Sequence, residues 1–185
     1  MNSLQNHLLI ATPMLNDPMF KRTVTYICEH NEEGAMGLVI NQPADLSVTS
    51  LLDKLEIVYP ENNQHLQGSV YQGGPVGRER GFVIHPPQDN WRASQKMSDD
   101  IMVTTSRDIL EALGSSAAPP QFLLTLGYAG WEAGQLEEEL GENSWLAIPA
   151  DPELLFNTPP SERWQKATEQ LGFDVWQLGP DVGHA

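Results

Sequence analysis

The triplet Cys28-Glu29-His30 places a thiol, a carboxylate and an imidazole side by side, and these are the groups that thiol catalysis uses. A nucleophilic cysteine needs a base within hydrogen-bond reach, and a third group must orient that base. In an extended strand, however, Cys28 and Glu29 face opposite sides, and His30 lies about 6–7 Å further along the face of Cys28. A lone cysteine in a strand is ordinarily a small buried hydrophobe. The spacing therefore favours an inert Cys28, and a reactive thiol is the alternative.

The histidines do not follow a metal-binding pattern. His7, His30, His65, His85 and His184 are scattered, without a His-x-x-x-His pair or a carboxylate at a recognised ligand spacing. We therefore expect no metal site. His85 follows an apolar segment and precedes two prolines, so it either lines a cleft at a strand end or is an ordinary hydrogen-bonded histidine. The second interpretation is favoured, because histidine is more often structural.

The glycine-rich segment 73–81 could hold an anion through free backbone amides and the two arginines Arg78 and Arg80. It matches neither the phosphate-binding loop GxxxxGK[ST] nor the dinucleotide fingerprint, and Pro75 removes one amide donor. The favoured alternative is a turn with an exposed Arg–Glu–Arg edge. No motif for a cofactor is present, and we expect none to be bound.

Two other groups of residues are predicted to be structural. The acidic run Glu137–Glu139 lies in a predicted helix, where consecutive side chains fan around the axis and cannot converge on a cation, so a solvated face is expected. The aromatic residues Tyr128, Trp131 and Trp145 are expected to pack in the core or at its rim rather than to form a ligand cage.

The composition bounds the class of protein. A chain of 185 residues fits one domain, residues 1–185, with a single sizeable core. The formal net charge of −15 disfavours contact with nucleic acid or with anionic membranes. A single cysteine excludes an internal disulfide, and no secretory signal or apolar stretch of the ~18 residues that span a bilayer is seen, so a cytoplasmic location is expected.

The hydrophobic pattern predicts strands and short helices in mixed order. Runs of β-branched, aromatic or continuous apolar residues predict strands over residues 7–11, 22–30, 35–41, 69–72, 82–85, 101–105, 121–126 and 143–148. Apolar residues at helical spacing predict helices over residues 47–55, 107–113, 131–140 and 159–171. Because strand and helix do not alternate strictly, the pattern favours an α+β protein with a mixed sheet over a doubly wound one.

The unit from residue 121 to residue 148 is expected to organise the rest of the chain. Its first strand, 121–126, is apolar throughout, and Gly127 and Gly130 are predicted to bracket an aromatic turn before the helix 131–140. The connection 12–20 is either pinned to the core or rims a binding site. Segment 59–64 is expected to be a loop, the polar region 88–100 to be anchored by Trp91, and the tail 179–185 to be mobile.

Four blocks follow one another along the chain. They are Leu9-Ile10-Ala11-Thr12-Pro13 with Asp17-Pro18-Met19-Phe20; residues 22–30 with residues 34–41; Gly73-Gly74-Pro75-Val76; and Leu126-Gly127-Tyr128-Ala129-Gly130-Trp131 with Gly134-Gln135-Leu136-Glu137 and Asn143-Ser144-Trp145. Together with the closing Gly183-His184-Ala185, they resemble the YqgE/AlgH family of bacterial proteins. The resemblance covers essentially the whole chain, in order.

The resemblance implies a compact α+β domain with a mixed, partly barrel-like sheet and flanking helices. It supplies no established activity, cofactor or catalytic residue. One member is named for a proposed role in regulating alginate synthesis, and a transcriptional-regulator label travels with the family. The sequence shows neither a helix-turn-helix nor a basic groove that would support direct contact with DNA.

The favoured hypothesis is a cytoplasmic, non-enzymatic binding or regulatory protein whose partner is a protein or a small anionic ligand. Its candidate groove combines the Pro13–Arg22 loop, the Gly73–Arg80 loop and the Gly127–Trp131 turn. The candidate residues are Pro13, Phe20, Arg22, Gly73, Gly74, Pro75, Arg78, His85, Tyr128 and Trp131. The alternative is an enzyme with a small-molecule pocket that uses His85, Cys28 or Glu137, and two of these residues in one pocket within hydrogen-bond reach would favour it. Direct nucleic-acid binding is the third hypothesis, and the net charge disfavours it.

Overall fold

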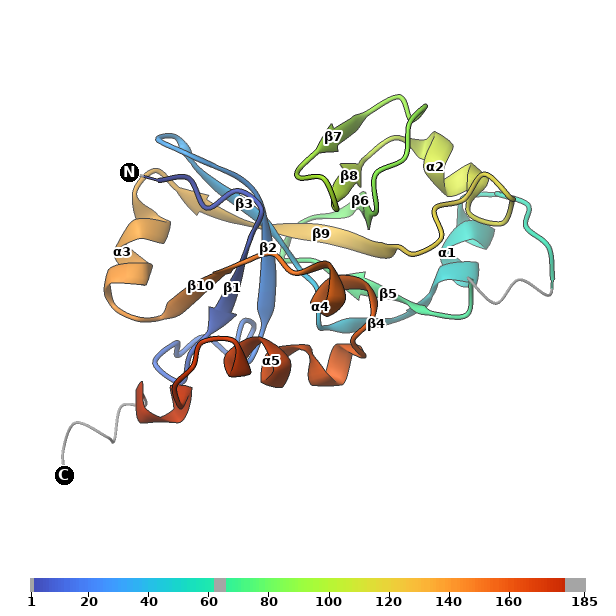
Figure 1. Cartoon of the computed structure of the whole chain (residues 1–185). Coiled ribbons are helices and arrows are strands. Elements are labelled where there is room, and N and C mark those ends of the chain that lie inside the picture. Colours follow the sequence, from blue (N-terminus) through green and yellow to red (C-terminus); the bar gives the residue numbers. More distant parts are fainter. Residues whose placement is uncertain (1, 62–65, 179–185) are drawn as a thin grey trace.

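A curled sheet is the frame of the molecule (Figure 1), as seen in a computed structural model that describes residues 2–61 and 66–178. The predicted mobile tail, part of the predicted loop 59–64, and His65 and His184 lie outside these residues. The sheet has ten strands, and its main path runs in the order β10-β1-β2-β3-β9-β6-β8-β7. Most neighbouring strands are antiparallel, while β5 pairs with β9 in parallel, so the sheet is mixed. The α+β class with a partly barrel-like sheet is thereby confirmed.

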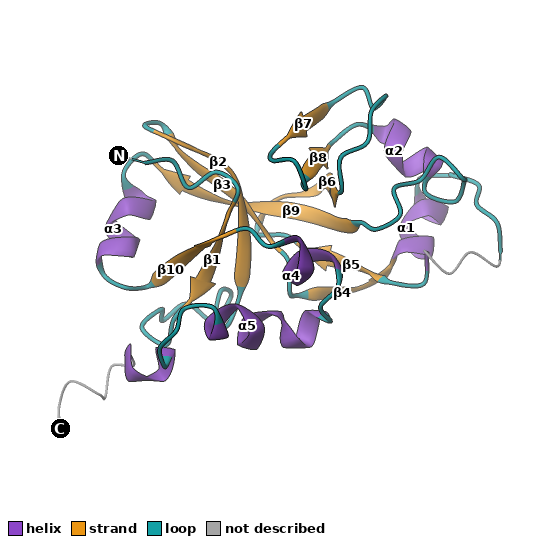
Figure 2. Ribbon diagram, in the orientation of Figure 1, coloured by secondary structure: helices purple, strands orange, loops and turns teal. Residues whose placement is uncertain are grey.

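The strands are β1 (His7–Ala11), β2 (Val24–Asn31), β3 (Gly34–Val39), β4 (Pro43–Ser47), β5 (Ser69–Gln72), β6 (Val76–His85), β7 (Ser94–Lys96), β8 (Met102–Thr104), β9 (Leu123–Glu132) and β10 (Trp145–Pro149). The helices are α1 (Val48–Lys54), α2 (Arg107–Ala112), α3 (Gln135–Gly141), α4 (Pro152–Phe156), α5 (Pro160–Glu169) and the 3₁₀ helix η2 (Val175–Leu178). Figure 2 shows these helices around the outside of the sheet.

Strand β9 joins the two halves of the sheet. It bonds to β3 through Ala129–Glu132 and to both β5 and β6 through residues that include Thr125 and Leu126. The predicted turn over residues 127–131 is therefore wrong. Gly127 has a φ of 81°, and an added Cβ would lie 2.5 Å from the carbonyl oxygen of Gly74, so the glycine permits a close backbone approach without ending the strand.

The segment 73–81 is also mostly strand rather than loop. Only Gly73, Gly74 and Pro75 separate β5 from β6, which begins at Val76. The ladder between β6 and β9 is irregular between Val76 and Gly81, so the intervening residues bulge from regular pairing. The predicted Arg–Glu–Arg edge does exist, because residues 78–80 are exposed on this strand.

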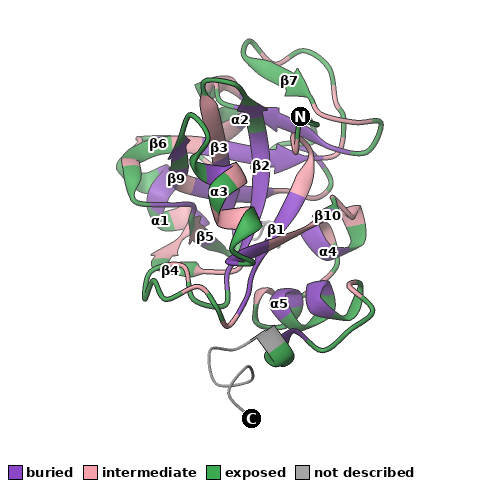
Figure 3. Cartoon of the chain, turned by 90° about the vertical axis from the view of Figure 1, so that its left-hand side faces the viewer, coloured by how far each residue is buried: buried purple, intermediate pink, exposed green. Residues whose placement is uncertain are grey.

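The core is built on both faces of the sheet. One cluster of buried apolar residues joins the sheet to α4 and α5, a second lies beneath α1 and α2, and a third joins β1, β9 and β10 to α3. Figure 3 shows the buried residues running along β1, β2 and β9 and along the inner side of α5. None of the helices in residues 2–61 and 66–178 is long and apolar enough to cross a membrane.

Buried Arg163 anchors α5 to the sheet. Its guanidinium donates to the carbonyl oxygens of Leu154 and Leu155 at 3.1 Å each, and also to that of Ile40. It lies 5.1 Å from the ring centre of Tyr71. A buried charge is tolerated because several acceptors surround it. This arrangement fixes the position of the next residue, Trp164, against the end of β1.

Several sequence predictions of elements are confirmed, and others miss short strands. The helices α1, α2 and α5 form where they are predicted, and the Ser47 hydroxyl caps α1 by accepting from the amide of Ser50 at 3.1 Å. Strands β4 and β7 were not predicted, because Pro43–Ser47 contains proline and aspartate and Ser94–Lys96 is entirely polar. Helix α3 begins at Gln135, four residues after the predicted start.

Candidate ligand-binding cleft

A cleft of about 220 Å³ lies between the loop after β1 and the C-terminal helices. We call it the Arg22 cleft, and it is lined by Ala11, Thr12, Pro13, Leu15, Lys21, Arg22, Trp164 and Trp176. Its walls therefore combine two cationic side chains, two indole rings and several apolar groups.

The backbone at Arg22 is held in an unusual conformation. Its φ of 56° is in the left-handed region, which costs a non-glycine residue about 1–2 kcal/mol. The side chain of Asn41 holds it there. The Asn41 carboxamide donates to the Arg22 carbonyl oxygen at 2.9 Å and accepts from the Val24 amide at 2.9 Å. Strain that the surrounding structure maintains is a feature of binding and active sites.

The Arg22 guanidinium lies over two tryptophan rings. Its carbon is 4.8 Å from the ring centre of Trp176 and 5.4 Å from that of Trp164. The two rings meet edge to face at 5.6 Å. Trp164 is buried and donates its indole N–H to the Ala11 carbonyl oxygen at 2.9 Å, whereas Trp176 is 48% exposed. The rings thus hold the cation in place, and its N–H edges stay available for hydrogen bonding.

The cleft is locally basic on an acidic protein. Lys21 and Arg22 are adjacent and exposed, although the whole chain carries a formal net charge of −15. Among the described residues, neither has an acidic side chain within the 4.0 Å of an ion pair. A guanidinium in this setting can bind a carboxylate through two parallel hydrogen bonds.

Of the ten candidate groove residues, Pro13 and Arg22 line this cleft, and the residues of the other two predicted segments do not. Phe20 belongs to the same loop but points into the core, where it packs edge to face on Trp145 at 5.9 Å. Lys21, Trp164 and Trp176 were not predicted as site residues. The sequence predicts a helix with Trp164 on its apolar face. No local pattern predicts that this face packs against the loop after β1.

Gly73 and Gly74, in the predicted Gly73–Arg80 loop, take part in the packing and hydrogen bonding of the sheet. The amide of Gly73 donates to Leu126 at 2.8 Å, and its carbonyl oxygen accepts from Val39 at 2.9 Å. Gly74 is buried, with a φ of 159° and less than 2.5 Å between an added Cβ and the backbone of Tyr128. Pro75 and Arg78 are exposed on this edge and do not line the Arg22 cleft.

His85 is an ordinary hydrogen-bonded histidine. It is fully buried, its Nδ1 lies 2.7 Å from the carbonyl oxygen of Pro86, and its Nε2 lies 2.7 Å from the Thr104 hydroxyl. Burial lowers the pKa of the imidazole, so His85 is neutral at pH 7. The alternative, in which His85 lines a cleft at a strand end, is wrong.

Trp131 and Tyr128 have packing roles, as the alternative to a ligand cage predicted, and the Tyr128 ring meets Phe82 edge to face at 6.1 Å. Trp131 is buried and meets Trp145 edge to face at 5.9 Å, and both indole N–H groups donate to Glu139, at 3.1 and 2.9 Å. Glu137 bonds to Nε2 of His30 at 2.7 Å. The prediction of a purely solvated acidic face is therefore wrong for these two glutamates.

The groups named for the enzyme hypothesis have separate partners. The Cys28 thiol is buried, and burial with a smaller effect of the Glu29 carboxylate raises its pKa to about 12, which keeps it protonated. His30 does not activate it, because Nδ1 of His30 accepts from the amide of Leu4 at 2.9 Å and Nε2 faces Glu137. Cys28, His85 and Glu137 thus form no hydrogen bond with one another among the described residues.

Comparison with known proteins finds relatives along the full chain. Residues 8–176 match the family described as AlgH-like. A UPF0301 protein from Pseudoalteromonas translucida is 60% identical over 185 residues and covers 100% of both chains. A UPF0301 protein from Vibrio cholerae is 55% identical over 186 residues, covering 99% of this chain and 100% of its own length.

Two solved structures are similar in fold. The solution structure of the AlgH protein from Pseudomonas aeruginosa has 45% sequence identity and a TM-score of 0.80, covering 100% of this chain and 97% of that one. The crystal structure of protein DIP2367 from Corynebacterium diphtheriae has 18% identity and a TM-score of 0.75, covering 97% and 92%. At that identity the second structure supports the fold alone.

Proposed function

The chain belongs to the AlgH-like family, and we propose that it is a cytoplasmic, non-enzymatic binding protein that recognises an acidic segment of a partner protein. The Arg22 cleft is the proposed recognition site. A regulatory role, of the kind that the family's transcriptional-regulator label describes, would then be exercised through a partner protein rather than through direct contact with DNA.

The single observation that carries this proposal is the fixed position of Arg22. Asn41 maintains its strained backbone, and Trp164 and Trp176 hold its guanidinium. A side chain that is ordered before binding loses less conformational entropy when a ligand arrives. The adjacent Lys21 adds a second positive charge that favours a carboxylate.

The surroundings of the cleft favour a protein over a small molecule. Its volume of about 220 Å³ is below the ~300–1,000 Å³ of ordinary small-molecule pockets, so it suits one side chain of a larger partner. Exposed apolar residues extend from both of its walls. They are Met14 and Met19 in the loop and Phe173 and Trp176 after α5, each at least 40% exposed. Exposed apolar residues beside a charged anchor are typical of protein interfaces.

Peptide binding tests this proposal. The probe is a set of fluorescein-labelled peptides in which one glutamate adjoins leucine or phenylalanine, each paired with a copy that carries glutamine instead. We expect a subset of the glutamate peptides to raise the fluorescence anisotropy and to change tryptophan emission, with at least about tenfold weaker binding of the glutamine copies.

Matched variants locate the binding. Arg22→Gln and Trp176→Ala should each weaken the selected peptides about tenfold or more, whereas Arg78→Gln, an exposed arginine outside the cleft, should leave binding unchanged. Equal binding by the wild-type and Arg22→Gln proteins would exclude the Arg22 cleft as the recognition site.

A further inference from the structure

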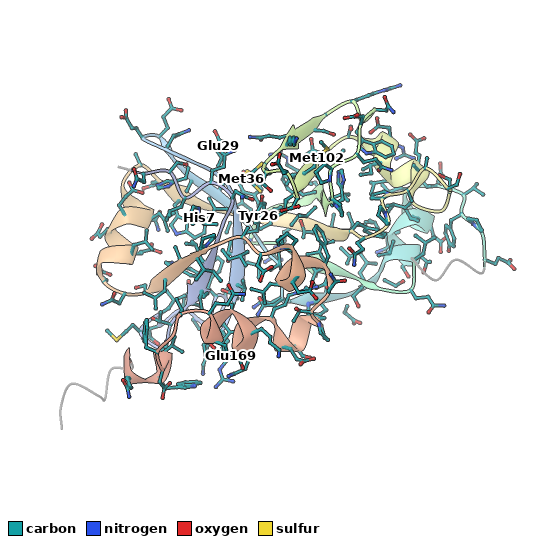
Figure 4. All side chains as sticks on the ribbon, in the orientation of Figure 1. His7, Tyr26, Glu29, Met36, Met102 and Glu169 are labelled. Carbon is teal, nitrogen blue, oxygen red and sulfur yellow. The ribbon has the colours of Figure 1, made fainter. Side chains whose placement is uncertain are left out.

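A second cavity, of about 320 Å³, lies between the β2–β3 hairpin and the strands β6, β7 and β8. We call it the Arg80 cavity, and it shares no lining residue with the Arg22 cleft. Figure 4 labels Glu29 and Met36 on the hairpin side of the gap between the two halves of the sheet and Met102 on the other side. The floor of the cavity is apolar, formed by Cys28, Met36, Phe82 and Val103.

Arg80 presents a fixed cation to this cavity. Its guanidinium carbon lies 5.4 Å from the ring centre of Phe82 and 5.6 Å from that of Tyr128. Within residues 2–61 and 66–178, no carboxylate lies within 4.0 Å of it. Stacking on two rings restricts the planar group, and its N–H edges remain free to bind a carboxylate.

Glu29, on the β2–β3 hairpin, presents the opposite charge to this cavity. It is exposed, and its hydrogen bond with the Asn31 amide is long, at 3.4 Å. Glu29 and Arg80 line one cavity but do not form an ion pair in the described structure. Two opposite charges that line one cavity without forming an ion pair can both be bound by a ligand that carries a negative and a positive group.

The hydroxyl of Ser94 is oriented by a chain of hydrogen bonds to buried His85. A carbonyl oxygen only accepts, so the proton of neutral His85 is on Nδ1, where it donates to Pro86, and Nε2 must accept from Thr104. Thr104 has then used its only proton, and its oxygen accepts from the Ser94 hydroxyl at 2.7 Å. Ser94 lines the Arg80 cavity, so it offers the ligand lone pairs rather than a proton.

We propose that the Arg80 cavity binds a free apolar amino acid as its zwitterion. The ligand carboxylate pairs with Arg80, and the ligand ammonium donates to Glu29 and to the lone pairs of Ser94. The apolar side chain lies on the floor formed by Cys28, Met36, Phe82 and Val103. A volume at the lower end of the ~300–1,000 Å³ range of ligand pockets suits a single amino acid.

Calorimetric titration of the whole protein with L-leucine tests this inference, together with two analogues that each lack one charge. L-Leucinamide lacks the carboxylate, and 4-methylpentanoate lacks the ammonium. We expect saturable binding of L-leucine and at least about tenfold weaker binding of both analogues. Absence of saturable binding for L-leucine, L-methionine and L-phenylalanine would overturn the proposal, as would 4-methylpentanoate binding as tightly as L-leucine.

Variants assign the contacts. Arg80→Gln and Glu29→Gln should each weaken L-leucine at least about tenfold, and Ser94→Ala should weaken it less, because one neutral acceptor is lost. Arg78→Gln, on the same strand and outside the cavity, is the matched control and should bind normally. Circular dichroism establishes that each variant is folded. Unchanged affinity in folded Arg80→Gln and Glu29→Gln would refute the assignment.

This experiment is independent of the proposed partner-binding site. Arg22→Gln should leave the affinity for L-leucine unchanged, since the two cavities have no residue in common. Loss of peptide binding in Arg22→Gln with normal L-leucine binding would separate the two sites.

Discussion

Two pairs of tryptophans in this protein have nearly the same geometry and different surroundings. Trp131 and Trp145 meet edge to face at 5.9 Å and 77°, and Trp164 and Trp176 do so at 5.6 Å and 62°. The first pair is buried, and both of its indole N–H groups bind one carboxylate, that of Glu139. The second pair carries the Arg22 cation on a partly exposed face.

The two pairs differ in the polar groups beside them and not in the geometry of their rings. Around Trp131 and Trp145 the hydrogen-bonding groups of the indoles are satisfied within the protein, so little is left for a ligand. Around Trp164 and Trp176, the guanidinium is positioned but its charge is not matched by a described carboxylate. The role proposed for the second pair therefore rests on the polar group beside it and not on the geometry of its rings.

Removing the carboxylate of the buried pair should have the largest effect. Glu139→Ala leaves two buried indole N–H donors without an acceptor, which should lower the free energy of unfolding by about 3 kcal/mol and the Tm by roughly 6–12 °C. Thermal denaturation measures this. Glu138→Ala, at the neighbouring exposed position, should change stability by less than about 0.5 kcal/mol. Equal effects of the two substitutions would contradict the structural role of Glu139.

Releasing the backbone of Arg22 should have an intermediate effect. Asn41→Ala removes two hydrogen bonds, to the Arg22 carbonyl oxygen and from the Val24 amide, and should cost about 1.5 kcal/mol of stability. Because Arg22 is then less fixed over Trp176, tryptophan emission should also change. The neighbouring Gln42→Ala, which loses one bond at 3.2 Å, should be milder in both measurements. Unaltered emission in Asn41→Ala would show that Asn41 does not position the cation.

The pH dependence of stability should reflect the burial of the His85 imidazole. Burial lowers its folded-state pKa from the ordinary value of 6.5, so the unfolded chain binds the proton more readily. The contribution of His85 to the free energy of unfolding is therefore fully present above pH 6.5. It is lost as the pH falls through 6.5 toward the lower folded-state pKa. Denaturation followed from pH 7.5 to pH 5 should show a shallower slope in His85→Gln. The same slope in both proteins would count against a neutral, buried imidazole.

The smallest effect on stability is expected within the Arg22 cleft itself. Arg22→Gly relieves the left-handed backbone strain, by about 1 kcal/mol, and loses cation–π contacts of similar size, so the net change in stability should be near zero. Peptide binding, in contrast, should be lost. Thermal denaturation and anisotropy on the same sample test both parts, and a strongly destabilised Arg22→Gly would mean that Arg22 is primarily structural.

Much of the fold could be predicted from local pattern, and the errors have local causes. Val24–Asn31 is rich in β-branched and aromatic residues, so its strand was evident. Gly127 does have the positive φ that is typical of a turn, but the chain continues as a strand because β9 pairs with β3 and β6. The polar strand β7 is formed by its pairing with β8, and the strand propensity of its own residues does not predict that pairing.

The site could be predicted only in part. Pro13 and Arg22 stood out as loop residues, and both line the cleft. Trp164 completes it through a hydrogen bond to Ala11, and Arg163 sets that geometry by bonding to Ile40; both contacts join parts of the chain more than 120 residues apart. Hydrophobic periodicity identifies the inner face of a helix but does not say which strand end that face will meet.

The bonding of β9 on both of its edges has a consequence for how the protein opens. At Thr125 the strand pairs with Tyr71 of β5 on one side and with Phe82 of β6 on the other, while its last residues pair with β3. The amides of residues 124–126 therefore cannot be freed without breaking the pairing of β9 with β5 or with β6. The amide hydrogens of residues 124–126 should consequently be among the last to exchange with deuterium, at a rate set by global unfolding rather than by a hinge.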